Sequence, residues 1–249
     1  MSSDLQHSTT RTPVSGFDPH DPSLANRQHE ILTDLLERCP VSWSEQHGGF
    51  WSLTKFDDIV AAARDYETYT VEQGVIVPSL GASTPIPPAR WIRRPTRSTA
   101  KSCCPSSPPK PCSPMRTPSG RLCGRPSPTS PTVMFMARVV TKDTVLGDVA
   151  LAAGDRVLVH LASANRDSAK FEDPNHLRFD LHRGGHAGFG LGIHRCVGSN
   201  LAPVQIELAW DELLQRMTAF RLVPGAEIEY ATGQVHGPER MPITFERLT

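Results

Sequence analysis

The stretch that decides the fold of this chain is Phe189-Gly190-Leu191-Gly192-Ile193-His194-Arg195-Cys196-Val197-Gly198, near the C-terminus. It places one cysteine in a glycine-rich turn, with an aromatic side chain seven residues before it and an amphipathic helical pattern after it. Glycine lets a backbone pass close to a large planar group. The N–H groups at the start of a helix stabilise a thiolate. The stretch therefore indicates a thiolate that is presented to a planar cofactor.

Two interpretations of this cysteine are open. Cys196 can be a buried structural residue and His194 a surface histidine, because a free cysteine often packs as a small hydrophobe. The full spacing F-G-x-G-x-H-x-C-x-G favours a ligand instead, since a thiolate is a strong axial ligand of haem iron. We then expect Phe189 to pack beside the sulfur and exclude water, and His194 to meet a haem propionate.

Composition limits the class of protein. The 249 residues carry a formal net charge of +0 at pH 7, which gives no indication of nucleic acid or an anionic membrane surface as a partner. The polar N-terminus and the lack of any long apolar run predict neither a signal peptide nor a membrane span. We therefore expect a cytoplasmic protein. The 6 cysteines then favour free thiols or ligands over disulfides.

Hydrophobic periodicity predicts ordered elements on both sides of an unusual middle segment. We predict a helix at 23–39 capped by Ser23, strands at 41–44 and 50–54 joined at His47-Gly48-Gly49, a helix from Asp57, strands at 133–140 and 145–151, a strand or buried helix at 156–164, a helix from Gly198 to about Met217, and a β-hairpin at 220–248. Proline at 203 is expected to kink the last helix.

The middle segment, 85–131, has an abnormal composition. It holds 13 of the 23 prolines and nine lysines or arginines but no acidic residue. So many prolines allow no helical or strand period, and we predict a disordered basic linker. Four cysteines lie here, but they lack the paired spacing of structural zinc sites, which argues against zinc. They are Cys103, Cys104, Cys112 and Cys123.

The cysteine stretch resembles the haem-binding loop of the cytochrome P450 family, the haem-thiolate monooxygenases, and is most similar to the soluble bacterial type. The resemblance extends to Arg138–Asp143, which is similar to the family's strand after helix K, and to Ala164-Asn165-Arg166-Asp167. Val41-Ser42-Trp43 with Gly48–Trp51 resembles its N-terminal sheet. Residues 20–84 and 132–249 match in order.

The resemblance implies a set of site residues. Cys196 is the expected axial ligand of haem b, Arg138 and His194 are the expected propionate partners, and His186 stands where the family often has a histidine. The remaining expected contacts to the cofactor are Phe189, Gly190, Gly192 and Gly198. The resemblance further implies a ferredoxin or flavoprotein as redox partner and a small organic substrate, with no role for nucleic acid or a membrane.

The sequence departs from the family in three places. No A-G-x-[DE]-T string of the oxygen-activating helix occurs, no arginine has a glutamate three residues before it, and the D-P-P-x-H-x-x-x-R string is absent. Permitted codons for Trp91 to Cys104 can encode a family-like string in another frame. We therefore hypothesise that residues 88–130 are a shifted reading frame followed by an internal deletion.

These observations leave three hypotheses for function. The first is a haem-thiolate monooxygenase, the second a non-catalytic remnant or gene-model artefact with residual haem binding, and the third an interaction protein with a basic linker. The family fold is mainly α with a small β region. For this chain we expect an α+β remnant that lacks the central helices, divided into a disordered N-terminus (1–22), an N-terminal part (23–84), the anomalous segment (85–131) and a haem-binding part (132–249).

Overall fold

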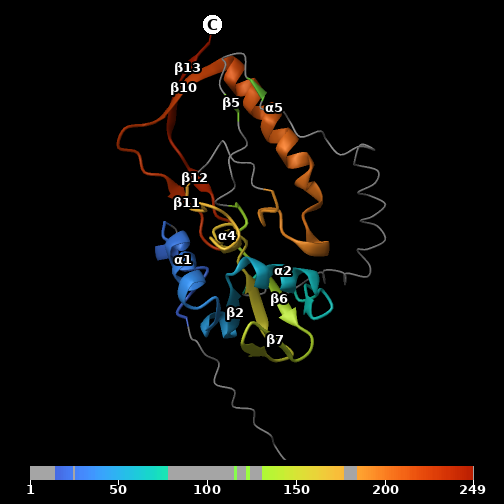
Figure 1. Ribbon diagram of the computed structural model, residues 1–249. Helices are drawn as coiled ribbons and strands as arrows, with labels where there is room; N and C mark the ends of the chain where they lie inside the picture. The colour runs from blue at the N-terminus through green and yellow to red at the C-terminus, as the bar shows by residue number, and fades with distance from the viewer. Residues whose placement is uncertain are drawn as a thin grey trace, which may run out of the picture.

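The computed structural model describes residues 15–24, 26–77, 115–116, 122–123, 131–176 and 184–248 (Figure 1). The expected disorder of residues 1–14 and of nearly all of the segment 85–131 lies outside these ranges, as do Cys103, Cys104 and Cys112. Inside the segment, the structure describes the short pair β4 (Met115–Arg116) and β5 (Leu122–Cys123). It therefore leaves the predicted linker largely untested.

A five-stranded sheet forms the centre of the fold. Its strands lie in the order β1 (Val41–Ser44), β2 (Phe50–Leu53), β9 (Arg156–Val159), β6 (Met136–Val140) and β3 (Tyr69–Thr70). β2 and β9 are parallel, and the other neighbouring pairs are antiparallel. A second pair, β7 (Thr144–Leu146) and β8 (Val149–Leu151), forms a hairpin. The sheet thus joins the segments before and after the proline-rich middle.

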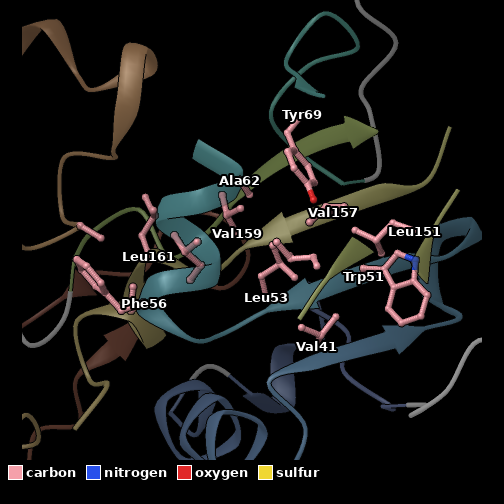
Figure 2. Close-up of a cluster of buried hydrophobic side chains, with 14 of the residues drawn as sticks. Val41, Trp51, Leu53, Phe56, Ala62, Tyr69, Leu151, Val157, Val159 and Leu161 are labelled. Carbon is pink, nitrogen blue, oxygen red and sulfur yellow. The ribbon is translucent and has the colours of Figure 1, made fainter. Parts of the chain in front are cut away.

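Each face of the sheet has its own hydrophobic core. One core lies under α2 (Phe56–Arg64), and Figure 2 shows Leu53, Val159 and Ala62 among the side chains gathered there. The other core lies on the side of α1 (Gln28–Arg38), with Leu32, Leu35, Phe50 and Leu158 buried together. Because strand residues alternate between faces, both faces of β2 and β9 are apolar and covered.

The N-terminal predictions hold with shifted boundaries. Both strands of the 41–54 hairpin are present, and the connection between them, η2 (Gln46–Gly48), turns through three residues with positive φ. The first helix is shorter than predicted, since Ser23 lies in the separate turn η1 (Pro22–Leu24) and Arg27 precedes α1 without a side-chain cap. The boundary at residue 22 does not coincide with packing, because Phe17 is buried in the α1-side core.

The later elements refine the sequence predictions. The predicted strand 145–151 is two strands, because the chain reverses at Gly147, which has a φ of 57°. The ambiguous run 156–164 is both a strand and a helix, since β9 is followed directly by α4 (Leu161–Ala164). The core thereby receives apolar residues from a strand and a helix in one continuous run.

The C-terminal part consists of one long helix and two strand pairs. α5 (Leu201–Arg216) runs from the cysteine loop to the pair β10 (Met217–Leu222) and β13 (Ile243–Arg247), as Figure 1 shows. β11 (Glu229–Tyr230) pairs with β12 (Pro238–Arg240). The kink predicted at Pro203 is wrong, because this residue lies in the first turn of α5, where an N–H would have no acceptor within the helix.

The described residues form a mixed α+β structure with four α-helices, α1, α2, α4 and α5. This confirms the mixed class that was expected for this chain. The lack of central helices stays a prediction. Within the part of the chain that the structure describes, no helix has the length and apolar character needed to cross a membrane.

Candidate functional site

The cysteine loop is closed on itself by backbone hydrogen bonds. The Cys196 N–H donates to the Phe189 carbonyl at 2.8 Å, and the Gly190 N–H donates to the Ala187 carbonyl at 2.8 Å. Cys196 precedes the short turn η4 (Val197–Ser199), and its side chain is exposed and not in a disulfide. The seven-residue spacing between the aromatic residue and the cysteine is therefore a structural unit that presents one thiol outward.

Gly192 fixes this loop to α2. Its φ is 68°, and a Cβ at this position would lie 2.1 Å from the carbonyl oxygen of Ala63 near the end of α2. Real side chains never approach so closely, so only glycine allows the turn η3 (Gly192–His194) to rest on that helix end. Gly198 has a different place, since a Cβ there would lie 3.7 Å from the Cys196 sulfur.

Two buried polar side chains that follow α4 accept backbone N–H groups of the loop and of α2. Asn165 is buried, and its Oδ1 accepts the Ala187 N–H of the loop at 2.7 Å. Asp167 is also buried, and its Oδ2 accepts the Phe56 N–H, the first residue of α2, at 2.9 Å. The loop and the helix on which it rests are thus positioned by one short segment of chain.

Arg138 supplies a buried positive charge near the loop. It lies on β6 and is only 4% exposed. Because strand side chains alternate between faces, it points to the same face of the sheet as Val140 of the α2-side core. Its Nη1 donates to the Ala137 carbonyl, and within the described ranges no carboxylate lies within ion-pair distance. Burial lowers the pKa of Arg138 to about 10, so the guanidinium remains charged at neutral pH.

His194 lies within the electrostatic reach of Arg138. Burial lowers the pKa of His194, and the charge of Arg138 lowers it further. A buried cation without a counterion is costly, and a second basic group beside it increases the cost. The pair is therefore suited to receive an anionic group.

The structure brings most of the predicted site residues together. Phe189, Gly190, Gly192, His194, Cys196 and Gly198 all belong to the one closed loop, and Arg138 lies near His194. His186 is connected more loosely: its ring centroid lies 6.1 Å from that of Phe189, and its Nδ1 accepts the Gly188 N–H. Both of these contacts are to the loop itself.

The residues present fit a haem group on chemical grounds. The loop offers a single accessible thiol, and among the described residues the buried guanidinium of Arg138 has no carboxylate partner, which a haem propionate would supply. The described residues contain no group of three or more His, Cys, Asp or Glu side chains that could hold a metal ion by themselves. Haem iron needs only one ligand from the loop.

Sequence reasoning missed the anchoring roles of Asn165 and Asp167. Both residues contributed to the family resemblance, but nothing in their spacing showed that they bind backbone N–H groups 22 and 111 positions away in the chain. Burial is the signal that reveals them, since a buried amide or carboxylate requires partners. That signal is available only from the structure.

Comparison with known proteins agrees with this site. The sequence profile of the cytochrome P450 family matches residues 125–231. A steroid C26-monooxygenase of Mycolicibacterium smegmatis is 37% identical over 118 residues, which is 47% of this chain and 29% of the relative. A linalool 8-monooxygenase of Pseudomonas putida is 44% identical over 92 residues, 36% of this chain and 22% of the relative. A methyl-branched lipid omega-hydroxylase of Mycobacterium bovis is 41% identical over 117 residues, 45% of this chain and 26% of the relative.

In each of these three pairs the match spans less than a third of the relative's length. The range of the profile match includes both Arg138 and the whole cysteine loop. The part of the chain that holds this site, within residues 125–231, thus matches the cytochrome P450 family.

Proposed function

We propose that the loop 184–200 binds haem b, with the Cys196 thiolate as the axial ligand and with Arg138 and His194 as partners of the propionates. The observation that carries this proposal is the buried guanidinium of Arg138, which lies beside His194 and has no carboxylate partner in the described structure. A propionate there offsets the cost of the buried charge. The accessible thiol of Cys196 supplies the other fixed point.

Each loop residue has a task in this proposal. The Phe189 carbonyl accepts the Cys196 N–H and so fixes the direction of the exposed thiol. Gly198 leaves the space beside the sulfur open. Gly190 and Gly192 give the tight backbone path. Thiolate-ligated haem supplies an iron centre at which dioxygen is reduced and its O–O bond is broken.

The activity of the whole protein is part of the proposal. We place the ancestral reaction among the monooxygenases, which insert one oxygen atom of O₂ into a small organic substrate with electrons from a ferredoxin or flavoprotein. The relatives are named for a steroid, linalool and methyl-branched lipids. Such varied names support the reaction class and no one substrate. We also propose a cytoplasmic location.

We further propose that this chain does not complete catalytic turnover on its own. Its sequence contains neither the A-G-x-[DE]-T string nor a Glu-x-x-Arg motif. The apolar side chains of α5 support the same view, because Leu201, Val204 and Leu208 are 59%, 47% and 61% exposed. Without elements that cover the other side of the haem, water would reach the reacting centre. The alternative is a non-catalytic remnant or gene-model artefact with at most residual haem binding.

The test is haem uptake by the full chain. The protein is expressed with haem, and the difference spectrum of the reduced carbon monoxide complex is recorded. We expect the Soret position of a thiolate-ligated haem for the natural chain and its loss in Cys196→Ser. Cys39→Ser is the matched control, since Cys39 is the other free cysteine in the described residues and lies beyond α1.

Each outcome bears on the proposal. A thiolate-type spectrum that depends on Cys196 and not on Cys39 supports the ligand. No haem uptake by a folded chain favours the remnant. The coding DNA tests the hypothesis for residues 88–130: if no alternative frame restores the family pattern, the shifted frame is excluded.

A further inference from the structure

The imidazole of His160 is fully buried and packs against two aromatic rings. His160 follows β9 directly and is 0% exposed. Its ring lies edge-on to Phe17, with centroids 5.3 Å apart, and tilted against Phe135 at 5.8 Å. Within the described structure neither ring nitrogen has a hydrogen-bond partner. The ring is therefore held as a neutral group at the cost of two unsatisfied nitrogens.

No charged side chain of the described residues offsets this situation. Burial alone lowers the pKa of His160 to about 3. The α1-side core on this side of the sheet is built of apolar side chains: Leu32, Leu35, Phe50, Val77, Met134, Ala137, Leu158 and Ala162. α1 also carries the buried Gln28 and the half-buried His29, whose ring lies 5.4 Å from that of His236. The nearest titratable groups on the N-terminal side have other partners, since Asp18 pairs with His47 and His20 contacts the Val77 carbonyl.

The two rings that enclose His160 are fastened very differently. Phe135 lies in a segment bound on several sides, because the Phe135 carbonyl accepts Gln234 Nε2, and the Met134 carbonyl accepts the Ala162 N–H. Phe17 lies on residues 15–24, which we call the strap and which contain no strand. The strap is held by hydrogen bonds from Ser15 N–H to the Trp43 carbonyl and from Ser44 Oγ to the Phe17 carbonyl, and by the side-chain contacts of Asp18 and His20, but by no strand pairing. Phe17 is thus the easier ring to displace.

We propose that His160 is an acid-sensitive lock on the strap, in which proton uptake by the imidazole requires Phe17 to leave and water to enter. One proton comes from solvent, and no bond other than the new N–H is formed. In the locked state the neutral ring of His160 packs against Phe17. In the released state the imidazolium is hydrated, and Phe135 loses the cover of the strap.

The coupling between proton binding by His160 and release of the strap determines how strongly the released population depends on pH. Only the released state binds the proton readily, so its population grows about ten-fold for each pH unit below the ordinary histidine pKa of about 6.5. Near pH 7 the released population is independent of this proton. The signature is therefore a one-proton slope confined to the strap.

Segment-resolved hydrogen exchange of the full chain measures this slope. Protection factors, corrected for the intrinsic exchange rate at each pH, are compared between the strap and β9 from pH 7.5 to 4.5. We expect strap protection to fall about ten-fold per pH unit below pH 6.5. β9 is expected to stay much better protected than the strap at each pH, because its release would need the sheet to open.

Two variants identify the group. His160→Leu conserves volume and removes the titration, so its strap protection is expected to be independent of pH. Asp18→Asn is the matched control: it removes the other titrating pair of the strap and is expected to keep the one-proton slope. If Asp18→Asn abolishes the pH dependence of strap protection and His160→Leu retains it, His160 is not the group that takes up the proton, and the proposal fails.

The natural chain alone can also overturn the proposal. Equal protection factors in the strap and in β9 at each pH would mean that both exchange by global opening and would exclude a local lock. A pH-independent strap would do so as well. These readings need no variant, so the proposal remains testable even if His160→Leu does not fold.

Discussion

At the scale of single residues, Gly192 decides whether the cysteine loop can rest on α2. The approach to the Ala63 carbonyl and the positive φ both exclude a side chain, for independent reasons. We predict that Gly192→Ala destabilises the chain by about 3 kcal/mol or more, because backbone on both sides must shift. Urea unfolding measures the loss, and haem uptake should fall with it.

Gly147→Ala is the control for backbone strain alone. Gly147 has a φ of +57°, but a Cβ there would meet nothing within 4 Å. Its expected cost is the left-handed conformation only, about 1–2 kcal/mol. Equal losses for the two variants would show that the contact with Ala63 contributes nothing and would contradict the role assigned to Gly192.

Arg138 is expected to oppose stability and support binding. Replacing a buried, uncompensated charge with an apolar side chain removes its desolvation cost. We predict that Arg138→Met leaves the haem-free chain as stable as before or about 1 kcal/mol more stable. Haem affinity should fall about ten-fold or more, since a propionate partner is lost. Urea unfolding measures the stability of the haem-free variant, and a haem titration followed by absorbance measures its affinity for haem. A haem-free variant that is less stable than the natural chain would contradict this account.

At the scale of elements, α2 is held at both ends by the site. Asp167 accepts the N–H of its first residue, Phe56, and Gly192 lies against its last turn. A buried carboxylate at a helix N-terminus satisfies an orphan N–H and opposes the helix dipole. α2 is therefore the element that links the Asn165–Asp167 segment to the cysteine loop.

Removing this carboxylate should loosen α2 and the loop together. We predict that Asp167→Ala costs about 1–3 kcal/mol, because the buried Phe56 N–H loses its acceptor. Asp57→Ala is the matched control, since Asp57 lies in the first turn of the same helix but is exposed, and its loss should cost under about 1 kcal/mol. Urea unfolding of both variants decides, and equal costs would contradict the prediction.

α5 carries two apolar stripes on opposite sides of the helix. Trp210 packs edge-on against Phe220 of β10 and is still 47% exposed, and Leu201, Val204 and Leu208 form a second exposed apolar stripe on the opposite side. A helix with apolar stripes on opposite sides is typical of one that is buried between two layers. Among the described residues, β10 and η4 contact α5 but leave both stripes largely exposed.

Elements with strong local signals could be predicted from the sequence. The 41–54 hairpin and α5 followed from periodicity, and the cysteine loop from its spacing. Ser23 failed as a cap because the turn at Pro22–Leu24 intervenes before α1 begins. The run 156–164 stayed ambiguous because full burial removes the polar positions that distinguish a strand from a helix.

At the scale of the whole molecule, long-range partners are the part that the sequence leaves open. Asn165 binds the loop, Trp51 Nε1 donates to Asp155 across 104 positions, and His160 is enclosed by Phe17 from the far N-terminus. Each contact depends on how the sheet brings the two halves together. No local pattern encodes it, so burial and pairing had to come from the structure.

The same burial gives the molecule a pH-dependent stability. Burial lowers the pKa of His160 to about 3, and burial together with the nearby Arg166 and His236 lowers that of His29 to about 4. Both ordinary values are 6.5. Below pH 6.5 both histidines are therefore protonated in the unfolded chain but remain neutral in the native state. The free energy of unfolding falls as pH falls for this reason.

The expected slope distinguishes the two histidines. Each contributes about 1.4 kcal/mol per pH unit, so between pH 6 and about pH 4 the pair should give about 2.7 kcal/mol per unit. Below pH 4 His29 is protonated in both states and only His160 contributes. Urea unfolding between pH 7.5 and 4.5 measures the slope, which His160→Leu should reduce by about half and His176→Gln, at an exposed side chain, should leave unchanged. A stability that is flat across this range, or equally steep in His160→Leu, would show that these rings are not shielded from protons in the native state.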